Sequence, residues 1–291
     1  MVTTRRNPDS LVKLCLVAVQ KLLASAAMKR TWNSNKNDLS NVVQSHIPHN
    51  LRQKLQEQVV QDWRVYDTVT LRLLELLFSP STSSLRLIHV RTFYRDAFVN
   101  LLPRLTGLLE LSVQDPVWTL SRRQLGMAAT ALSAMTHLRV LTLQYCAHDR
   151  LLAVVGANCP FIQVVDVRGS RDVTDEGVWS LVTLDPGGAF LSLESHSQKQ
   201  KVSEKFRNCW GAAVKSLTSR LVTVLTEATL QAEQTEEEDY PVTWCRCCST
   251  LTYIDLRCTR VTPVGLSLLT QALPPTTQIV RNAQGCLATQ T

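Results

Sequence analysis

The sequence lacks a long uninterrupted hydrophobic run. No segment approaches about 18 uncharged apolar residues, the length that a membrane-spanning helix needs. Near the N-terminus, Asp9, Lys13 and Lys21 interrupt the apolar residues, and no small-residue cleavage site of a signal peptide follows them. Hydrophobic residues nevertheless make up 45% of the chain and charged residues 19%, which is typical of a folded protein. We therefore expect a cytoplasmic or nuclear protein that has no membrane partner.

Motifs for catalysis and metal binding are absent as well. None of the six histidines stands in an H-E-x-x-H spacing, and there is no G-x-S-x-G nucleophile elbow and no G-x-x-x-x-G-K phosphate loop. Cys245, Cys247 and Cys248, with Cys209 or Cys258, offer enough thiols for a zinc site. However, C-x-C-C is not a standard zinc spacing, so we interpret these cysteines as reduced thiols beside a core strand. The sequence thus predicts no enzyme activity, no metal site and no cofactor.

Aromatic residues are scarce, at 6% of the chain. Their scarcity bears on the formal net charge of +7, which lies wholly within residues 1–100, whereas the remaining residues are balanced. A groove for single-stranded nucleic acid interleaves basic side chains with aromatic ones, and the sequence lacks that pattern. We therefore expect a solvated basic face and no nucleic-acid partner. Such a face would also suit an acidic protein partner.

What the sequence does have is an internal repeat. An apolar triplet in the frame Φ-x-x-Φ-x-Φ recurs at intervals close to the roughly 20–29 residues of leucine-rich repeats, and a second apolar stretch with helical spacing follows it. Such strand–helix units bury their apolar faces only by stacking. We therefore predict an α/β leucine-rich-repeat solenoid, a horseshoe with parallel strands on its concave face and helices on its convex face. The triplets are Leu85, Ile88, Val90; Leu108, Leu111, Val113; Leu138, Leu141, Leu143; Ile162, Val165, Val167; and Leu251, Ile254, Leu256.

Two of these units resemble the cysteine-containing type of leucine-rich repeat. They cover residues 158–178 and 251–266, which agree with that pattern in order. Ser170 stands in the place of the usual cysteine in the first unit, whereas Cys258 keeps it in the second. Repeats of this type are common in the substrate receptors of ubiquitin ligases, so the resemblance implies a protein-binding module.

The distance from Ile162 to Leu251 is too long for one repeat. We expect repeats over residues 81–275, with an irregular insert around 195–248 and a tail over 276–291. The gap has room for one or two degenerate repeats, with candidate triplets at residues 188–193 and from Leu221 to Val224. An acidic run over residues 233–239 is interpreted as a solvated loop, and the alternative is a docking segment for a partner.

Residues 1–80 do not follow the repeat and predict helices instead. Leu11, Cys15 and Val19 recur at every fourth position and so form one stripe along a helix that begins near Asp9 or Ser10. One interpretation is an N-terminal helical cap, since a solenoid must cover the exposed end of its core. In that case, Leu11 and Cys15 are expected to be buried under the first repeat.

The same stripe resembles a known binding motif. Ser10-Leu11-x-x-x-Cys15-x-x-x-Val19 is similar to the Elongin-binding box of VHL-box and SOCS-box proteins. In that box the leucine enters an apolar pocket of Elongin C. The resemblance therefore implies that Leu11, Cys15 and Val19 bind Elongin.

A second motif lies downstream, where Ile47-Pro48-x-x-Leu51 looks like the cullin-two box of VHL-box proteins. That resemblance implies that Ile47, Pro48 and Leu51 bind a cullin. The two motifs and the repeats together resemble the PRAME and Zyg/Zer families of cullin–Elongin ligase receptors. They imply a substrate-recognition subunit that binds Elongin B/C, a cullin and an unidentified protein substrate. The alternative is a non-ligase scaffold whose N-terminal helices only cap the repeats.

The repeat frame also predicts a partner-binding face. Polar residues between and beside the apolar positions point to the concave side, because strand side chains alternate. An acidic column beside an arginine column is suited to grip a peptide through charge pairs and bidentate hydrogen bonds, and the alternative is a surface whose residues satisfy each other. The first column is His89, Ser112, Thr142, Asp166 and Asp255, and the next is Arg91, Gln114, Gln144, Arg168 and Arg257.

Overall fold

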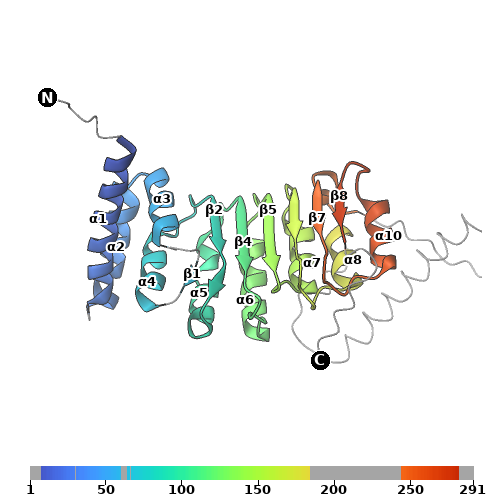
Figure 1. Ribbon diagram of the computed structural model, residues 1–291, viewed down its shortest axis with the longest axis horizontal. Helices are drawn as coiled ribbons and strands as arrows, with labels where there is room; N and C mark the ends of the chain where they lie inside the picture. Colours follow the sequence, from blue (N-terminus) through green and yellow to red (C-terminus); the bar gives the residue numbers. More distant parts are fainter. Residues whose placement is uncertain (1–7, 30, 60–63, 66, 184–243, 282–291) are drawn as a thin grey trace, which may run out of the picture. The chain divides into compact units, whose positions relative to one another are not determined.

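The computed structural model describes residues 8–29, 31–59, 64–65, 67–183 and 244–281 (Figure 1). Within these residues, successive repeats each contribute one strand to a six-stranded sheet in which all neighbouring strands are parallel. This confirms the predicted α/β class and the parallel sheet. In spatial order, the strands are β2 (Ser84–Leu87), β4 (Glu110–Gln114), β5 (Val140–Gln144), β6 (Val164–Asp166), β7 (Tyr253–Asp255) and β8 (Gln278–Val280).

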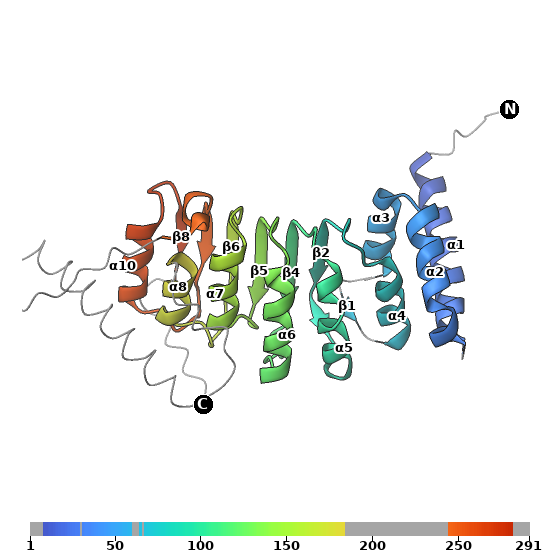
Figure 2. The same ribbon diagram turned by 180° about the vertical axis from the view of Figure 1, so that it is seen from behind.

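Helices and short 3-10 turns connect these strands and lie together on one face of the sheet (Figures 1 and 2). The other face carries no helix among the described residues, and we call it the open face. The connecting elements are η2 (Thr92–Tyr94), α5 (Arg95–Val99), η3 (Leu102–Arg104), α6 (Arg122–Ser133), α7 (Asp149–Asn158), α8 (Asp175–Val182), η4 (Arg246–Ser249) and α10 (Pro263–Ala272).

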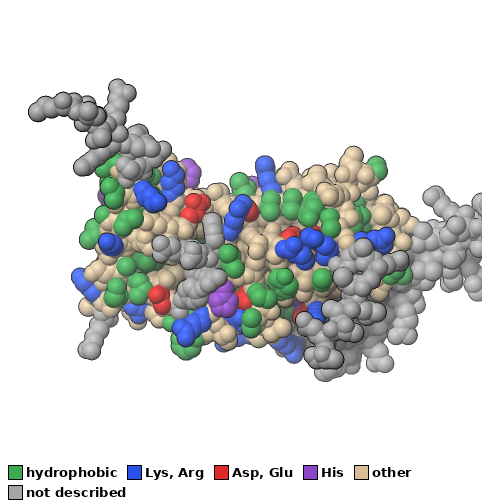
Figure 3. Space-filling view, in the orientation of Figure 1, with side chains coloured by type: hydrophobic (Ala, Val, Ile, Leu, Met, Phe, Trp, Pro, Cys, Tyr) green, Lys and Arg blue, Asp and Glu red, His purple; other side chains and the backbone are tan. Residues whose placement is uncertain are grey.

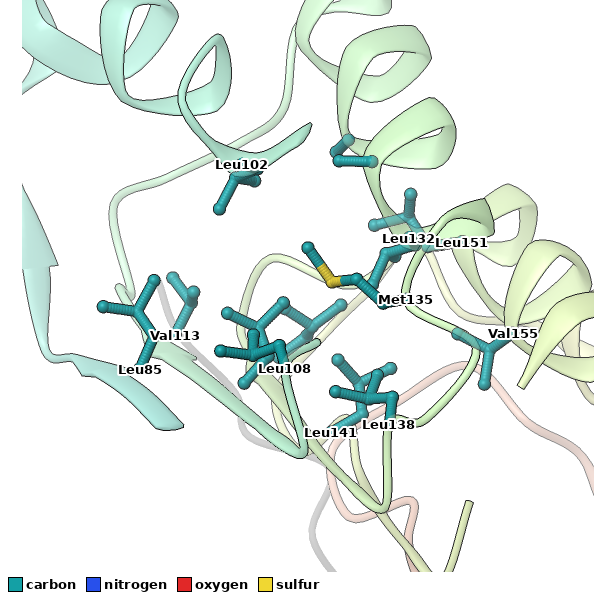
Figure 4. Close-up of a cluster of buried hydrophobic side chains, with 14 of the residues drawn as sticks. Leu85, Leu102, Leu108, Val113, Leu132, Met135, Leu138, Leu141, Leu151 and Val155 are labelled. Carbon is teal, nitrogen blue, oxygen red and sulfur yellow. The ribbon is translucent and has the colours of Figure 1, made fainter. Parts of the chain in front are cut away.

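The core lies between the sheet and these helices. Alternate strand residues such as Leu111 and Leu141 are buried there, and they occupy matching positions in neighbouring strands. Figure 4 shows Leu108, Leu138 and Met135 beside Leu141, with Leu132 on α6. Because Leu111 and Leu141 lie opposite each other in neighbouring units, the core continues from one unit to the next.

The first triplet begins three positions earlier in the sequence than predicted. Leu85 pairs with Leu111 and Leu87 with Val113, so the first unit uses Leu85 and Leu87, preceded by buried Thr82. The prediction failed because two overlapping frames fit this unit. The frame that starts at Leu85 is wholly apolar, whereas the frame that the structure uses starts with the polar Thr82. The hydroxyl of Thr82 accepts a hydrogen bond from the backbone N–H of Ser79 at 3.2 Å, which satisfies it in the core.

His89 and Val90, which the predicted frame placed in the large sheet, form a separate short strand. This strand, β3 (His89–Val90), pairs in parallel with β1 (Arg64–Val65) in a two-stranded sheet. Ile88, which was expected in the core, is exposed. The correction therefore also changes which residues of the first unit lie on the open face.

The long gap in the sequence does not interrupt the sheet. β6 pairs directly with β7, with Val165 opposite Ile254, although the insert separates them in the chain. The candidate degenerate triplets at 188–193 and 221–224 and the acidic run at 233–239 lie outside the described residues. Thr183 and Trp244, the described residues on either side of residues 184–243, form an isolated antiparallel bridge.

A recurring hydrogen-bond device joins consecutive helices. The carboxylate of Asp149, at the start of α7, accepts hydrogen bonds from the N–H and the hydroxyl of Thr174, both at 2.7 Å. Asp175, at the start of α8, does the same for Thr262, with its Oδ1 2.7 Å from the Thr262 nitrogen. Thr174 and Thr262 are the N-caps of α8 and α10. Each aspartate therefore fixes the start of the next helix, and the second link spans the insert.

The N-terminal region is helical, as predicted. α1 (Pro8–Met28), α2 (Trp32–His46) and α3 (His49–Val59) each pack against α4 (Thr68–Leu77). Their shared core includes Trp32, Val43, Leu55 and Leu73. The side-chain amides of Gln53 and Gln56 on α3 donate to the carbonyl of Ser84 at 2.9 and 3.2 Å. α3 is thereby attached to the first strand of the large sheet.

Candidate protein-binding surfaces

One side of α1 is apolar and exposed. Leu11, Leu14 and Leu22 are 63%, 66% and 71% exposed, and Cys15 is exposed as well. Positions three, four, seven and eleven residues apart lie on one face of an α-helix, so these side chains form a single strip. We call Leu11, Leu14, Cys15 and Leu22 the α1 strip. It contradicts the expectation that a capping helix buries Leu11 and Cys15 under the first repeat.

Val19 does not belong to this strip. It is half-buried and packs against the core, as do Leu16 and Leu23. The physical reason is helix geometry, because each step of four residues turns about 40° beyond a full turn. Two such steps carry a side chain from the exposed side of α1 towards its buried side. The structure thus places two of the three predicted Elongin-binding residues on the surface and the third at the interior contact.

α1 is also more hydrophobic than the sequence analysis allowed. The window Leu11–Met28 is long and apolar enough to cross a membrane by length and composition, and only 6% of it is buried. Lys13 and Lys21 interrupt the window without making it polar. The expectation that no segment qualifies is therefore revised. Length and composition also fit an apolar helix that docks into a protein groove.

The predicted cullin-binding residues lie where α2 ends and α3 begins. Ile47 is the C-cap of α2 and packs against the core, while Leu51 is half-buried. Pro48 is exposed, and its carbonyl accepts hydrogen bonds from the N–H groups of Leu51 and Arg52, both at 3.0 Å. The turn thus brings the three residues together but presents Pro48 most fully to solvent.

The register of the large sheet determines which polar residues share a column on the open face. Ser112, Thr142, Asp166 and Asp255 lie opposite one another in neighbouring strands, as predicted. His89 does not belong with them, because Arg86 pairs with Ser112. By the same register, Ile88 follows Leu87 at the position that was assigned to Arg91. In the next column, Gln114 lies opposite Gln144. Arg168 and Arg257 stand two residues after the paired Asp166 and Asp255, just beyond the ends of β6 and β7.

Several of these polar residues are less exposed than the alternation of a strand suggests. Asp255 is only 1% exposed, and Ser112 and Gln144 are buried too. Neighbouring strands lie about 4.8 Å apart, so longer side chains on either side cover the shorter ones. The expectation that both columns are exposed is therefore wrong for these three residues.

The buried polar groups of the open face satisfy one another. Nε of Arg257 donates to Oδ1 of Asp255 at 3.0 Å, and the hydroxyl of Tyr253 donates to Oδ2 at 3.3 Å. Burial acts to raise the pKa of the Asp255 carboxyl, but the hydrogen bonds and the charge of Arg257 outweigh it, so this pKa lies below its ordinary value. One column over, Nε2 of Gln144 donates to Asp166 at 2.6 Å, and Arg168 donates to Oε1 of Gln144 at 2.9 Å.

A buried ion pair that the sequence analysis missed explains the position of His89. Asp115 is fully buried and accepts hydrogen bonds from the N–H groups of Val90 and Val117 at 3.2 and 3.1 Å. It also lies 3.3 Å from Nη2 of Arg95 and 3.1 Å from Nδ1 of His89. An aspartate directly after a buried strand was the signal that could have identified it. This cluster joins β3 to the end of β4 and is structural.

Large apolar side chains at the carboxyl ends of the strands were also missed. Phe93, Val117 and Tyr145 are all exposed in the loops that leave β3, β4 and β5. Tyr145 has a positive φ of 69°, and its ring lies against the backbone of Gly169 in the next loop. These residues add apolar area at the edge of the open face.

Most cysteines of the repeats are buried free thiols, namely Cys146, Cys159, Cys245, Cys247 and Cys248, whereas Cys258 is exposed. Burial raises the pKa of the Cys146 and Cys159 thiols to about 12. The thiols of Cys247 and Cys248 donate to the carbonyls of Leu181 and Val182, each at 3.3 Å, and so hold η4 against the end of α8. In the part of the chain that the structure describes, no group of three or more His, Cys, Asp or Glu side chains is arranged to hold a metal ion.

Comparison with known families decides the nature of the repeated unit. Residues 247–269, which span β7 and run from η4 into α10, match the leucine-rich-repeat family model. The unit is similar to a leucine-rich repeat. Its strand continues the register of the units before it, which supports a leucine-rich-repeat protein and hence a protein-binding module. No curated protein and no solved structure significantly matches the chain.

Proposed function

We propose that the protein is the substrate-recognition subunit of a cullin–Elongin BC ubiquitin ligase. The observation that carries this proposal is the exposure of Leu11 and Cys15 on α1. The opposite side of α1 packs against the helical core through Leu16 and Leu23, so the helix is held in place while the α1 strip faces outward. In this proposal the protein acts in the cytoplasm or nucleus, and its partner subunits carry out the ubiquitin transfer.

The binding mode is an amphipathic helix in an apolar groove. Fully burying an exposed leucine contributes roughly 1.5–3 kcal/mol, so Leu11 with its neighbour Leu14 offers a substantial share of a stable contact. Because Val19 already packs inward, the contact with Elongin depends on Leu11 and Cys15, with Leu14 beside them. The turn at Pro48 would supply the adjoining contact with a cullin.

A non-ligase scaffold is the second candidate, and a different observation favours it. α3 is hydrogen-bonded to Ser84 through Gln53 and Gln56, so the N-terminal helices cover the start of the first strand. Such a contact is what a cap of a repeat array needs. Attachment through α3 leaves the α1 strip free, so this role does not by itself account for the exposed leucines.

The two candidates are separated by capture of purified Elongin B/C on the immobilised full chain. We expect wild type to capture the complex and the double variant Leu11→Ser, Cys15→Phe to lose it. Leu22→Ser is the matched control, because it removes another exposed leucine from the same helix and should keep binding. Equal capture by wild type and the double variant, or no capture by wild type, would exclude the ligase role. Co-sedimentation with lipid vesicles that needs Leu22 as much as Leu11 would assign the α1 strip to a membrane surface instead.

A further inference from the structure

We infer that the open face of β5, β6 and β7 binds an acidic segment of a partner protein that also carries an apolar residue. This inference rests on the proposed role as a protein-binding repeat module and is independent of Elongin binding. It names the chemistry of the substrate that the repeats would recognise.

The first support is the arrangement of side chains on these three strands. Val140, Val164 and Tyr253 lie opposite one another and form a half-buried apolar column at the beginning of the strands. Arg168 and Arg257 lie beyond the other ends of β6 and β7. In Figure 3, Lys and Arg side chains gather over β7, and a row of hydrophobic side chains runs above them. The face thus offers apolar contact and positive charge at separate positions.

The second support is that the neighbouring aspartates are already engaged. Asp255 is buried beneath Arg257 and Tyr253, and Asp166 accepts from Gln144 and from the backbone N–H of Arg168 at 3.0 Å. These carboxylates are therefore not available to a basic peptide. Instead, the Asp255 carboxylate and the Gln144 amide orient the two guanidinium groups above them.

Each guanidinium retains donors for an incoming carboxylate. A guanidinium carries five N–H groups, and Arg257 uses only Nε and Nη2 on Asp255 among the described residues. Arg168 donates through Nη2 to Gln144, and its Nη1 makes no hydrogen bond among the described residues. Pre-oriented donors of this kind match the two oxygens of a carboxylate.

Local charge places the acidic group over β6 and β7 rather than elsewhere on the sheet. Arg171 and Arg260 are both exposed and stand three residues after Arg168 and Arg257. The negative charge of the exposed Asp172 offsets the positive charge of only one of them. At the opposite edge of the same face, Arg86 on β2 already pairs with Glu110 on β4 at 2.6 Å. Residues 55–198 and 216–291 contain arginine but no lysine. Arginine is the better residue for bidentate recognition of carboxylates.

Strand geometry sets the spacing in the bound segment. Neighbouring strands are about 4.8 Å apart and an extended chain rises about 3.3 Å per residue, so two acidic residues separated by no more than one position can reach both arginines. The apolar column lies four residues before the arginines in the sequence, so about 13 Å separates the two along the strand direction. The segment therefore needs an apolar residue about four positions from its acidic pair.

A random-peptide display selection on the immobilised full chain tests this inference. We expect the selected peptides to be enriched in paired Asp or Glu with an apolar residue at that spacing. We expect their affinity to fall about tenfold or more, equivalent to about 1.4 kcal/mol, in the double variant Arg168→Gln, Arg257→Gln. Arg123→Gln with Arg139→Gln is the matched control, because it removes the same charge from exposed arginines outside the site.

A second variant covers the case in which loss of Arg257 destabilises the protein. Val140→Glu adds a carboxylate to the apolar column and should weaken the same peptides while the chain stays folded in a thermal melt. Selected peptides without acidic enrichment, equal binding to both double variants, or no selected peptide at all would overturn the inference. Tighter binding of a single-stranded oligonucleotide at the same arginines would replace it with a nucleic-acid site. Elongin capture uses α1, so its failure is measured separately.

Discussion

Leucines on α1 and leucines on the repeat strands have opposite environments. Leu11 and Leu14 are 63% and 66% exposed, whereas Leu111 and Leu141 are 2% exposed or less. Both regions are rich in leucine and both are regular, so hydrophobic content alone does not tell them apart. In the repeats, the inward positions of β4 and β5 have partners in the neighbouring units. On α1, only one side of the helix has such a partner, and the apolar side chains of the other side remain for another molecule.

The largest effect should come from the repeat side of this comparison. Leu141 is fully buried in β5, with strands on both sides and the helices above it. Leu141→Ala should lower the free energy of unfolding by about 2–5 kcal/mol, because it removes buried methyl groups and leaves a cavity. Urea denaturation followed by circular dichroism measures this loss. A loss below about 1 kcal/mol would show that the core at β5 is loosely packed, and it would weaken the contrast with α1.

The links between helices should give the next largest effect. A Cβ atom on Gly265 would lie 2.3 Å from Oδ1 of Asp175, the residue that holds Thr262. Gly265→Ala should therefore cost about 1–3 kcal/mol of unfolding free energy, because the carboxylate or the helix must shift. Gly126→Ala is the matched control in α6, where an added Cβ meets nothing within 4 Å. It should stabilise the protein by about 0.5–1 kcal/mol, since alanine is the better helix former.

If the two glycine variants behave alike in the same denaturation experiment, the Asp175–Thr262 contact does not join the units across the insert. If they differ in sign, the helices on either side of the insert are coupled as tightly as those of continuous repeats. The same comparison can be made at Gly177, where a Cβ would lie 2.1 Å from Oδ1 of Asp149.

Sequence periodicity was sufficient for the repeats from β4 to β7, whereas β8 pairs with β7 from residues that were expected to form a tail. The triplets beginning at Leu108, Leu138, Ile162 and Leu251 are all buried in one register, because alternation and stacking are local consequences of the apolar pattern. The first unit was misplaced because its apolar residues fit two frames. Only the pairing of Leu85 with Leu111 distinguishes them.

The binding surfaces were harder to predict because their exposure depends on neighbours that are distant in the sequence. Val19 fits the same four-residue spacing as Leu11, yet it packs on the helical core. Asp255 alternates outward, but Tyr253 and Arg257 cover it. No periodic pattern contains the contact of Asp115 with Arg95, because it joins the residue after β4 to the start of α5.

A smaller effect is expected from the open face, and it depends on pH. Because the pKa of Asp255 is lowered in the folded protein, its carboxylate stabilises the fold above the ordinary pKa of about 3.9 and loses this contribution as the pH falls below it. Asp255→Asn should cost about 1 kcal/mol at neutral pH, because it removes the charge that pairs with Arg257. Denaturation of both proteins across the acid range measures the difference. A difference that stays constant below about pH 4 would contradict this assignment.

The smallest effect on stability should come from the α1 strip. Leu14→Ser removes a leucine that is 66% exposed, so the free energy of unfolding should change by no more than about 0.5 kcal/mol. Leu16→Ser, on the side of α1 that packs against the core, is the control and should cost clearly more. Urea denaturation of the full chain compares the two. A cost for Leu14→Ser as large as that for Leu16→Ser would mean that the chain itself covers the strip, and α1 would then be a cap. A negligible cost, together with reduced Elongin capture, would mean that the exposed leucines serve a partner.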